Sequence, residues 1–285
     1  MKIGYIKTRG TGLLQLVDGN PCPPLPTCTR VNPNLGIINL YTNASSSTYN
    51  ALQVSATKRL SGSVSAGLHY TWSRLIDDVT DVIAASSSEF GRAQDSLDRR
   101  ADRARSGYDR PHRLTGNFVY ELPFYRSQTG LRGMVFGGWQ LSSMFTFQSG
   151  APFTVTLGAD PFQSGNPIRP NLNTDLDLSS MTIHEILAAG GANLFRGLDP
   201  GQLVGNAGRN ILRSDGLSQV DLGIIKNTRL SDGVRIQIRA DVFNAFNSRN
   251  FGIPNGALNS GANFLNQWAT NGGNRRVVLA ARLTF

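Results

Sequence analysis

Apolar and polar residues alternate with a period of two in several stretches of the chain. The alternation is clearest in the second arm of a predicted hairpin over residues 49–77. One face of this arm holds Val64, Ala66, Leu68, Tyr70 and Trp72, and the other holds small or polar residues. A period of two is that of a β-strand, whose successive side chains point to opposite faces. This arm of the hairpin is longer than the ~5 to 6 residues usual for a strand of a soluble domain.

The same pattern recurs along the chain and predicts eight strands in all. Beside the two arms of the hairpin, they are residues 2–8, 112–122, 138–148, 217–228, 234–244 and 275–285. The alternation of residues 138–148 continues a little further through Phe153, Val155 and Leu157. A short helix is predicted over residues 182–189, with Ser180 as a possible N-cap and Gly190 as its end.

The connections between these strands differ strongly in length. If the strands alternate in direction, the long loops 9–48, 77–110, 158–216 and 247–274 all fall at one end, and the short ones 61–62, 123–137 and 230–233 at the other. Bacterial outer-membrane barrels show this asymmetry. The sequence therefore predicts an all-β fold, an antiparallel up-and-down transmembrane β-barrel segment of about eight strands with long extracellular loops.

The two faces of the predicted strands give candidate functional residues. Tyr70, Trp72 and Trp139 fall near strand ends on the apolar face, where barrels carry aromatic girdles. The polar face would line the lumen, and its ionisable residues would either guide a polar solute or, as we favour for most of them, neutralise one another. They are His69, Glu121, Asp221, Arg235, Arg239, Asp241 and Arg282.

Composition agrees with membrane insertion through strands. The 285 residues are 40% hydrophobic with a mean hydropathy of -0.20, and no stretch approaches the ~18 apolar residues of a transmembrane helix. The first ten residues contain no apolar run that could be a signal peptide. If the chain reaches a membrane, it does so as strands.

The net charge of +9 raises the question of an anionic partner. Nucleic acid is not predicted, because the basic residues are scattered and are not interleaved with aromatic residues suited to base stacking. The densest basic run, residues 99–113, also contains Asp102 and Asp109, which favours a solvated, internally paired loop. The alternative is a surface for phosphates, including those of lipopolysaccharide, because the Arg fork matches phosphate geometry.

No motif of an enzyme, a cofactor site or a metal site is recognisable, and no catalytic residue is predicted. Cys22 and Cys28 have neither zinc-ribbon nor redox spacing, so a local disulfide is expected, with two separate thiols as the alternative. Asp77, Asp78 and Asp81 lack the spacing of a calcium loop and are interpreted as a solvated acidic turn.

A series of short stretches resembles the C-terminal part of the barrel of TonB-dependent outer-membrane receptors, in particular the Oar-like group. One of them is Asp241-Val242-Phe243-Asn244-Ala245-Phe246-Asn247, and another is the alternating terminal segment that ends on Phe285. The others are residues 49–53, 70–73, 109–114, 120–124, 138–141, 148–153 and 250–252.

This resemblance implies a location in the outer membrane and energised uptake of a large nutrient by the intact receptor. It further implies that Phe285 is a signal for the outer-membrane barrel-assembly machinery, and that a TonB-type coupler acts only through a plug domain. Residues 1–285 show neither plug nor signal peptide, so we expect the tail of a truncated or split reading frame. The alternatives are a self-contained eight-stranded barrel acting as an adhesin or surface anchor, and a soluble basic β-protein that binds an anionic polymer.

Overall fold

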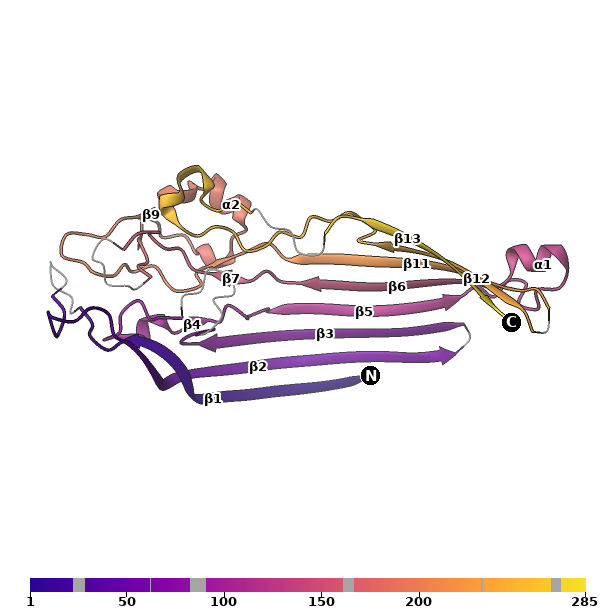
Figure 1. Cartoon of the computed structure of the whole chain (residues 1–285), viewed down its shortest axis with the longest axis horizontal. Helices are drawn as coiled ribbons and strands as arrows, with labels where there is room; N and C mark the ends of the chain where they lie inside the picture. Colours follow the sequence, from indigo (N-terminus) through magenta and orange to yellow (C-terminus); the bar gives the residue numbers. More distant parts are fainter. Residues whose placement is uncertain (23–28, 62, 83–90, 161–166, 232, 268–272) are drawn as a thin grey trace.

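One large antiparallel sheet dominates the computed structural model, which describes residues 1–22, 29–61, 63–82, 91–160, 167–231, 233–267 and 273–285. Within these residues the strands follow the order of the chain, and the short β4 (Ala104–Arg105) pairs with β3 (Figure 1). The long strands are β1 (Lys2–Asp18), β2 (Asn39–Ser61), β3 (Val64–Asp77), β5 (His112–Glu121), β6 (Trp139–Gln148), β11 (Leu217–Arg229), β12 (Arg235–Phe243) and β13 (Arg276–Thr284). The predicted all-β, up-and-down architecture is confirmed.

Cross-strand rows of apolar side chains explain why these segments pair in this register. One row runs through Tyr120, Leu141, Ile224, Ala240 and Leu279, on five neighbouring strands. Aromatic and β-branched residues pack well on such a pleated surface. The row nevertheless stays open to its surroundings, since Ile224 is 46% and Leu279 76% exposed. The part of the chain that the structure describes therefore does not cover this row of the apolar face.

The predicted loop over residues 9–48 is wrong at both ends. β1 continues to Asp18 and β2 begins at Asn39, and the two strands pair through most of this added length. The added part of β2 is largely polar, so it lacks the alternation that predicts a strand. Backbone groups form the pairing there and do not require an apolar face. Two register shifts interrupt the pairing between Thr11 and Gln15, beside Gly12, whose φ is +67°.

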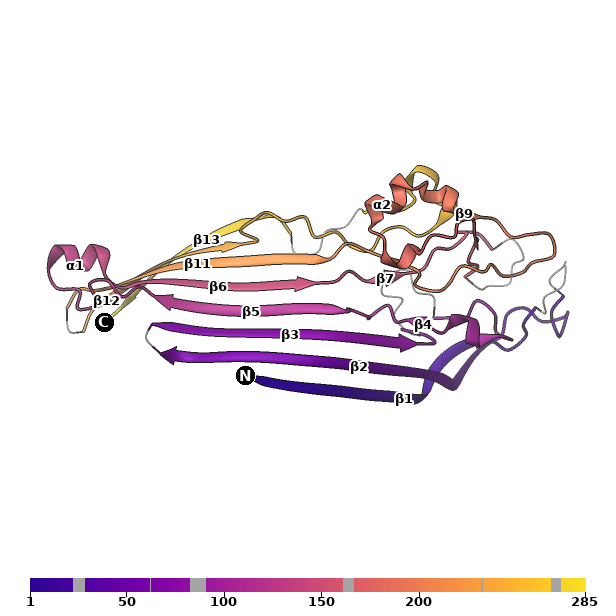
Figure 2. The ribbon, with the colours of Figure 1, turned by 180° about the vertical axis from the view of Figure 1, so that it is seen from behind.

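The connections are sorted between the two ends of the sheet, as predicted (Figures 1 and 2). At the turn end, the connection between β5 and β6 holds α1 (Gly130–Phe136), and the chain finishes near it. The opposite, loop end carries the remaining small elements of the described residues. They are η1 (Arg99–Asp102), β7 (Pro152–Phe153), β8 (Asn171–Leu172), η2 (Leu178–Ser180), α2 (Ile183–Ala188), η3 (Gly191–Leu194), β9 (Phe195–Arg196), β10 (Leu212–Arg213) and η4 (Leu258–Asn263).

The buried hydrophobic core lies at the loop end and not between the long strands. Its ten residues come from the connections after β6 and after β12. They are Phe153, Val155, Leu178, Ile183, Ile186, Leu194, Phe195, Leu212, Phe264 and Leu265. The described residues of these connections and of the segment 77–111 fold together into what we call the loop cluster. The long connections thus form a folded body of their own.

The end of β6 differs from the prediction. Phe153 and Val155 do not continue that strand: β7 pairs with β10 in a separate two-stranded sheet, and both side chains are fully buried in the loop core. Phe153 and Val155 do alternate with polar residues, but the chain leaves the large sheet after Gln148, and these two side chains fill the core at the loop end.

The N-cap of helix α2 lies two residues after Ser180, its predicted cap. Thr182 is the N-cap, because its hydroxyl accepts from the Glu185 amide at 3.3 Å and the Glu185 carboxylate accepts from the Thr182 amide at 2.7 Å. This reciprocal pair is a capping box. The chain leaves the helix through Gly190, whose φ is +135°. Among the described residues, no helix is long and apolar enough to cross a membrane.

Gly150 is expected to tolerate no side chain. A Cβ there would stand 1.8 Å from the Ser214 carbonyl oxygen, so Gly150→Ala must push two backbone segments apart. We expect a loss of about 1–3 kcal/mol in the stability of the loop cluster, measured by thermal unfolding. Gly197→Ala is the control, because nothing lies within 4 Å of that position. Equal effects of the two substitutions would contradict the packing described here.

Candidate functional site: polar face and loop cluster

The polar face of the sheet collects the residues predicted to line a lumen. Residues that lie opposite each other on neighbouring strands, such as His69 and Thr115 or Gly223 and Asp241, form cross-strand rows on this face. The register places all seven predicted residues on this one face: His69, Glu121, Asp221, Arg235, Arg239, Asp241 and Arg282. Their role as lumen residues stays a prediction.

A groove of about 860 Å³ runs along this face. Four of the seven residues line it, namely His69, Asp221, Arg239 and Asp241. Arg239 and Asp241 form an ion pair at 2.6 Å, and Asp221 accepts from the Asn244 amide at 2.8 Å. Arg235 and Arg282 line a smaller hollow near the turn end. This mixed lining offers donors and acceptors to a polar solute, and part of its charge is already neutralised.

The three predicted girdle aromatics lie on the opposite, apolar face. Trp72 is level with His112 in the register, and Trp139 lies beyond Tyr120 toward the turn end. Tyr70 forms a 2.8 Å hydrogen bond with His112 Nδ1 and stacks on its ring. About ten residue positions separate the two tryptophans along the strands, which at ~3.3 Å per residue and a tilt of ~40° is roughly 25 Å. Their girdle role stays a prediction.

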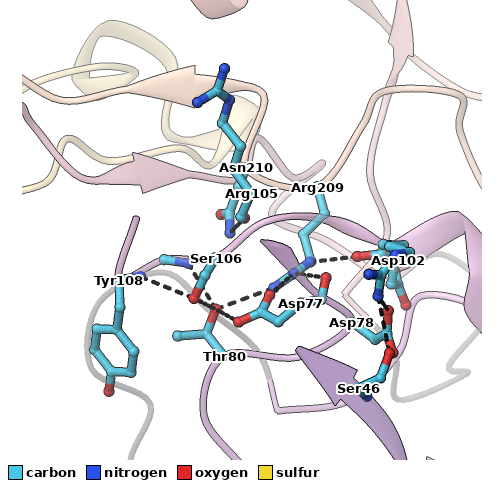
Figure 3. A network of polar contacts seen from close by, with 12 residues as sticks. Ser46, Asp77, Asp78, Thr80, Asp102, Arg105, Ser106, Tyr108, Arg209 and Asn210 are labelled. Carbon is cyan, nitrogen blue, oxygen red and sulfur yellow. Dashed lines mark hydrogen bonds and ion pairs between the residues drawn. The ribbon is translucent and has the colours of Figure 1, made fainter. Parts of the chain in front are cut away.

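Buried ion pairs join the loop cluster to the end of β3. Figure 3 shows Arg209 pointing at Asp77, with which it forms an ion pair. Arg209 also donates to the Asp102 carbonyl oxygen at 2.7 Å. Asp77 is 4% and Arg209 9% exposed, so this charge pair is almost entirely removed from water. Asn210 adds a further link, donating to the Arg105 carbonyl oxygen at 2.8 Å.

Two more carboxylates are buried in the same network. Asp102 pairs with Arg169 and accepts from the Gln94 amide at 3.0 Å. Asp109, which is 0% exposed, pairs with Arg213 at 2.9 Å and Arg105 at 3.3 Å. A buried charge is stable only when it is paired and hydrogen-bonded, and these are. The network fixes the loops to the strand ends.

Two sequence interpretations are corrected by this network. Residues 99–113 are not a solvated, internally paired loop, because Asp102 and Asp109 are buried and bind Arg169 and Arg213 from a connection far along the chain. Asp77 is buried as well, so the interpretation of Asp77, Asp78 and Asp81 as a solvated acidic turn is wrong for Asp77. Among the described residues, no group of three or more His, Cys, Asp or Glu could hold a metal ion.

Sequence reasoning missed Arg169, Arg209 and Arg213. All three stand in the connection between β6 and β11, where no periodicity marks them. Their function depends on carboxylates 60 or more residues away in the chain, as in the pair of Arg169 with Asp102 (67 residues). The one signal lay in the composition, where most of the 28 basic residues are Arg, since buried ion pairs favour the guanidinium.

Asp78 is more exposed than the carboxylates of Asp77, Asp102 and Asp109 in this network. Burial works to raise the pKa of its carboxyl, but hydrogen bonds from Arg103 and Ser46, together with the Arg103 charge, outweigh burial and hold the pKa below its usual value. Arg103 approaches at 2.8 Å, and the Ser46 amide and hydroxyl donate at 2.8 and 2.9 Å. Asp78 thereby ties the start of the loop to β2.

We expect this tie to weaken in acid. Because the folded pKa of Asp78 is lowered, its stabilisation is fully present above the unfolded value of about 3.9 and is lost as the pH falls through the folded value. The stability difference between the wild type and Asp78→Asn should therefore be largest near neutral pH and shrink below about pH 4. Thermal unfolding at a series of pH values measures it. A difference that is constant with pH would contradict the assignment.

Two predicted features lie at the ends of the described chain segments. Cys22 is disulfide-bonded, whereas Cys28, the partner predicted for it, lies outside the described residues. Phe285 is 95% exposed and directly follows β13, whose apolar side chains include Leu283. Its role as an assembly signal stays a prediction.

A match to one family model agrees with this geometry. Residues 1–278 match the family model described as "Outer membrane beta barrel domain". No curated protein matches the chain. Among solved structures, the chain is similar to the outer membrane transporter YddB from Escherichia coli, with 10% identity and a TM-score of 0.43. That alignment covers 99% of this chain and 30% of the transporter, so the chain spans less than a third of the transporter's length.

Proposed function

Since the chain belongs to the outer membrane beta barrel domain family, we propose that it forms the C-terminal part of the barrel of a TonB-dependent receptor that takes up a large polar nutrient. The family places the chain in the outer membrane, so the soluble anion-binding alternative is set aside. The apolar face then meets lipid, and the polar face with its groove meets water.

The two edges of the sheet carry this proposal. β1 pairs with β2, and β13 pairs with β12; within the described residues the two edge strands do not pair with each other. An open edge is not tolerated in hydrocarbon, because its backbone N–H and C=O groups find no water there. Further strands closing the barrel satisfy these groups and enclose a lumen wide enough for a large solute.

The ends of the sheet indicate its orientation. Outer-membrane barrels turn through short periplasmic connections and extend long loops outward. The turn end with α1 would therefore face the periplasm, and the loop cluster the cell exterior. Fixed by its buried ion pairs, the loop cluster would present a defined surface to an arriving solute.

The transport cycle would use partners outside the described residues. The barrel-assembly machinery would insert the chain after contact with the segment ending at Phe285, and a TonB-type coupler would act through a plug domain. The groove would contribute hydrogen bonds and charges from Asp221, Arg239 and Asp241 to the passing solute. We assign no catalytic role, cofactor or metal to these residues.

The mass of the protein in the outer membrane tests the proposal. An antibody against the loop cluster should detect, in the outer-membrane fraction, a polypeptide much larger than 30.8 kDa, and crosslinking should join that band to a TonB-type protein. A band at 30.8 kDa whose migration is heat-modifiable would overturn the receptor proposal. It would support the alternative, a self-contained barrel that acts as an adhesin or anchor, since eight strands suffice to close.

A further inference from the structure

Two rows of basic side chains cross the apolar face at the loop end. In the register, Lys7 lies opposite Asn50, and Asn50 opposite Arg74. The next row on the same face contains Arg9, Thr48, Ile76 and Arg105. Positions two apart on a strand share a face, so Lys7, Arg9, Arg74 and Arg105 form one patch, which we call the basic rows.

An aromatic row lies directly beside them, toward the turn end. It consists of Tyr5, Leu52, Trp72 and His112, paired across four strands. Trp72 is 56% and Tyr5 67% exposed on the lipid-facing side. Aromatic residues of this kind sit at the level of lipid headgroups, which places the basic rows just outside the hydrocarbon.

A hollow of about 860 Å³ opens where the strands meet the loop cluster. Trp72, Arg74 and His112 line it from the sheet side. Arg105, Arg213, Asp177, Ser179 and Ser180 line it from the loop cluster. The hollow is thus bounded by aromatic rings, guanidinium groups and hydroxyls, and it faces the lipid side of the sheet rather than the lumen.

The hollow and the basic rows carry an excess of positive charge. Within the described residues, Lys7, Arg9 and Arg74 form no ion pair with any carboxylate. Arg105 and Arg213 share the single buried carboxylate of Asp109. Asp177 is the acidic residue that lines the hollow itself, whereas Asp109 lies behind Arg105 and Arg213 as their ion-pair partner. Among the described residues, the five cations of the hollow and the basic rows thus meet only the carboxylates of Asp109 and Asp177, so positive charge is in excess there.

We propose that this surface binds the phosphorylated headgroup of an outer-leaflet glycolipid, lipopolysaccharide being the fitting class. Guanidinium groups match phosphate oxygens in two parallel hydrogen bonds, and charge-assisted bonds are the strong ones. The hollow accommodates the sugar, and the aromatic row contacts the start of the acyl chains. The inference uses the outward orientation of the loop end given above and is independent of any transport activity.

The test uses the protein as it occurs in the outer membrane, purified in mild detergent and titrated with lipopolysaccharide, either intact or enzymatically dephosphorylated. The variant is Lys7→Gln, Arg9→Gln and Arg74→Gln combined. We expect it to bind intact lipopolysaccharide at least about tenfold more weakly than the wild type. The charge-conserving variant, Lys7→Arg, Arg9→Lys and Arg74→Lys combined, should retain most of the binding.

The matched control removes three cations from the opposite face, by Arg113→Gln, Arg235→Gln and Arg282→Gln, and should leave the affinity unchanged. Folding of each variant is checked by heat-modifiable migration.

Loss of binding on dephosphorylation, with no competition by millimolar inorganic phosphate, supports a lipid ligand. The proposal is overturned if the variant in the basic rows binds as the wild type does, if the control weakens binding equally, or if inorganic phosphate binds as tightly as the lipid. The mass of the native band, which tests the receptor proposal, has no influence on any of these outcomes.

Discussion

Replacing Arg209 with Met is expected to destabilise the loop cluster by about 3–5 kcal/mol, because it leaves the buried carboxylate of Asp77 without a counter-charge. The substitution preserves most of the side-chain volume and removes the charge together with the hydrogen bonds to Asp77, the Asp102 carbonyl and the Thr80 hydroxyl. Native-state hydrogen exchange of the amides in β7 and β10 reports the local stability. Strand amides in the centre of the sheet should keep their protection.

An exposed ion pair provides the control for Arg209. Arg196 and Asp199 form a pair three residues apart, and their side chains are 44% and 50% exposed. Arg196→Met should change the stability far less than Arg209→Met does, because water and salt screen such exposed pairs. A second test combines Arg209→Met with Asp77→Asn, which removes both charges and should recover part of the loss. If Arg209→Met and Arg196→Met have equal effects, the buried network does not hold the loops.

Replacing Leu68 with Arg is expected to cost about 2–4 kcal/mol, the cost of a guanidinium on the lipid face near the middle of a barrel strand. Leu68 lies on the apolar face between the levels of Trp139 and Trp72, opposite Ala56 and Gly116, and is 45% exposed. Equilibrium unfolding in urea, with the protein folded in lipid vesicles and followed by tryptophan fluorescence, measures the cost.

The neighbouring residue gives a matched control on the other face. His69→Arg adds the same side chain one position along the strand, where it enters the groove among polar groups. Its cost should stay below about 1 kcal/mol, as for ordinary substitutions exposed to water. A larger effect at His69 than at Leu68 would mean that the assignment of the two faces is reversed.

The sequence predicted the sheet well because each membrane strand carries its own pattern. Residues 112–122 and 217–228 were expected as strands, and β5 and β11 agree with them to within one residue. The reason is local: a strand with lipid on one side and water on the other must alternate at every second residue. The same alternation put all seven predicted polar residues on one face, without any knowledge of which strands are neighbours.

Where that environment ends, the sequence signal fails. The outer parts of β1 and β2 have no apolar face toward lipid, and polar residues such as Gln15, Asp18 and Ser45 are buried there. Their polar sequence therefore looked like a loop although their backbones pair. Phe153 and Val155 alternated as in a strand, yet they fill the loop core. Similar local patterns therefore led to different structures, depending on what packs against them.

The sequence alone determined the all-β class, the strand boundaries within the membrane, the two faces and the sorting of long and short connections. Those features follow from the contact of each residue with lipid or water, which a period of two reveals. Only the tertiary structure decided that Arg209 binds Asp77, that Arg169 binds Asp102, and that Lys7, Arg9, Arg74 and Arg105 gather on one side. These contacts join residues far apart in the chain, and no periodic pattern along the chain encodes such pairings.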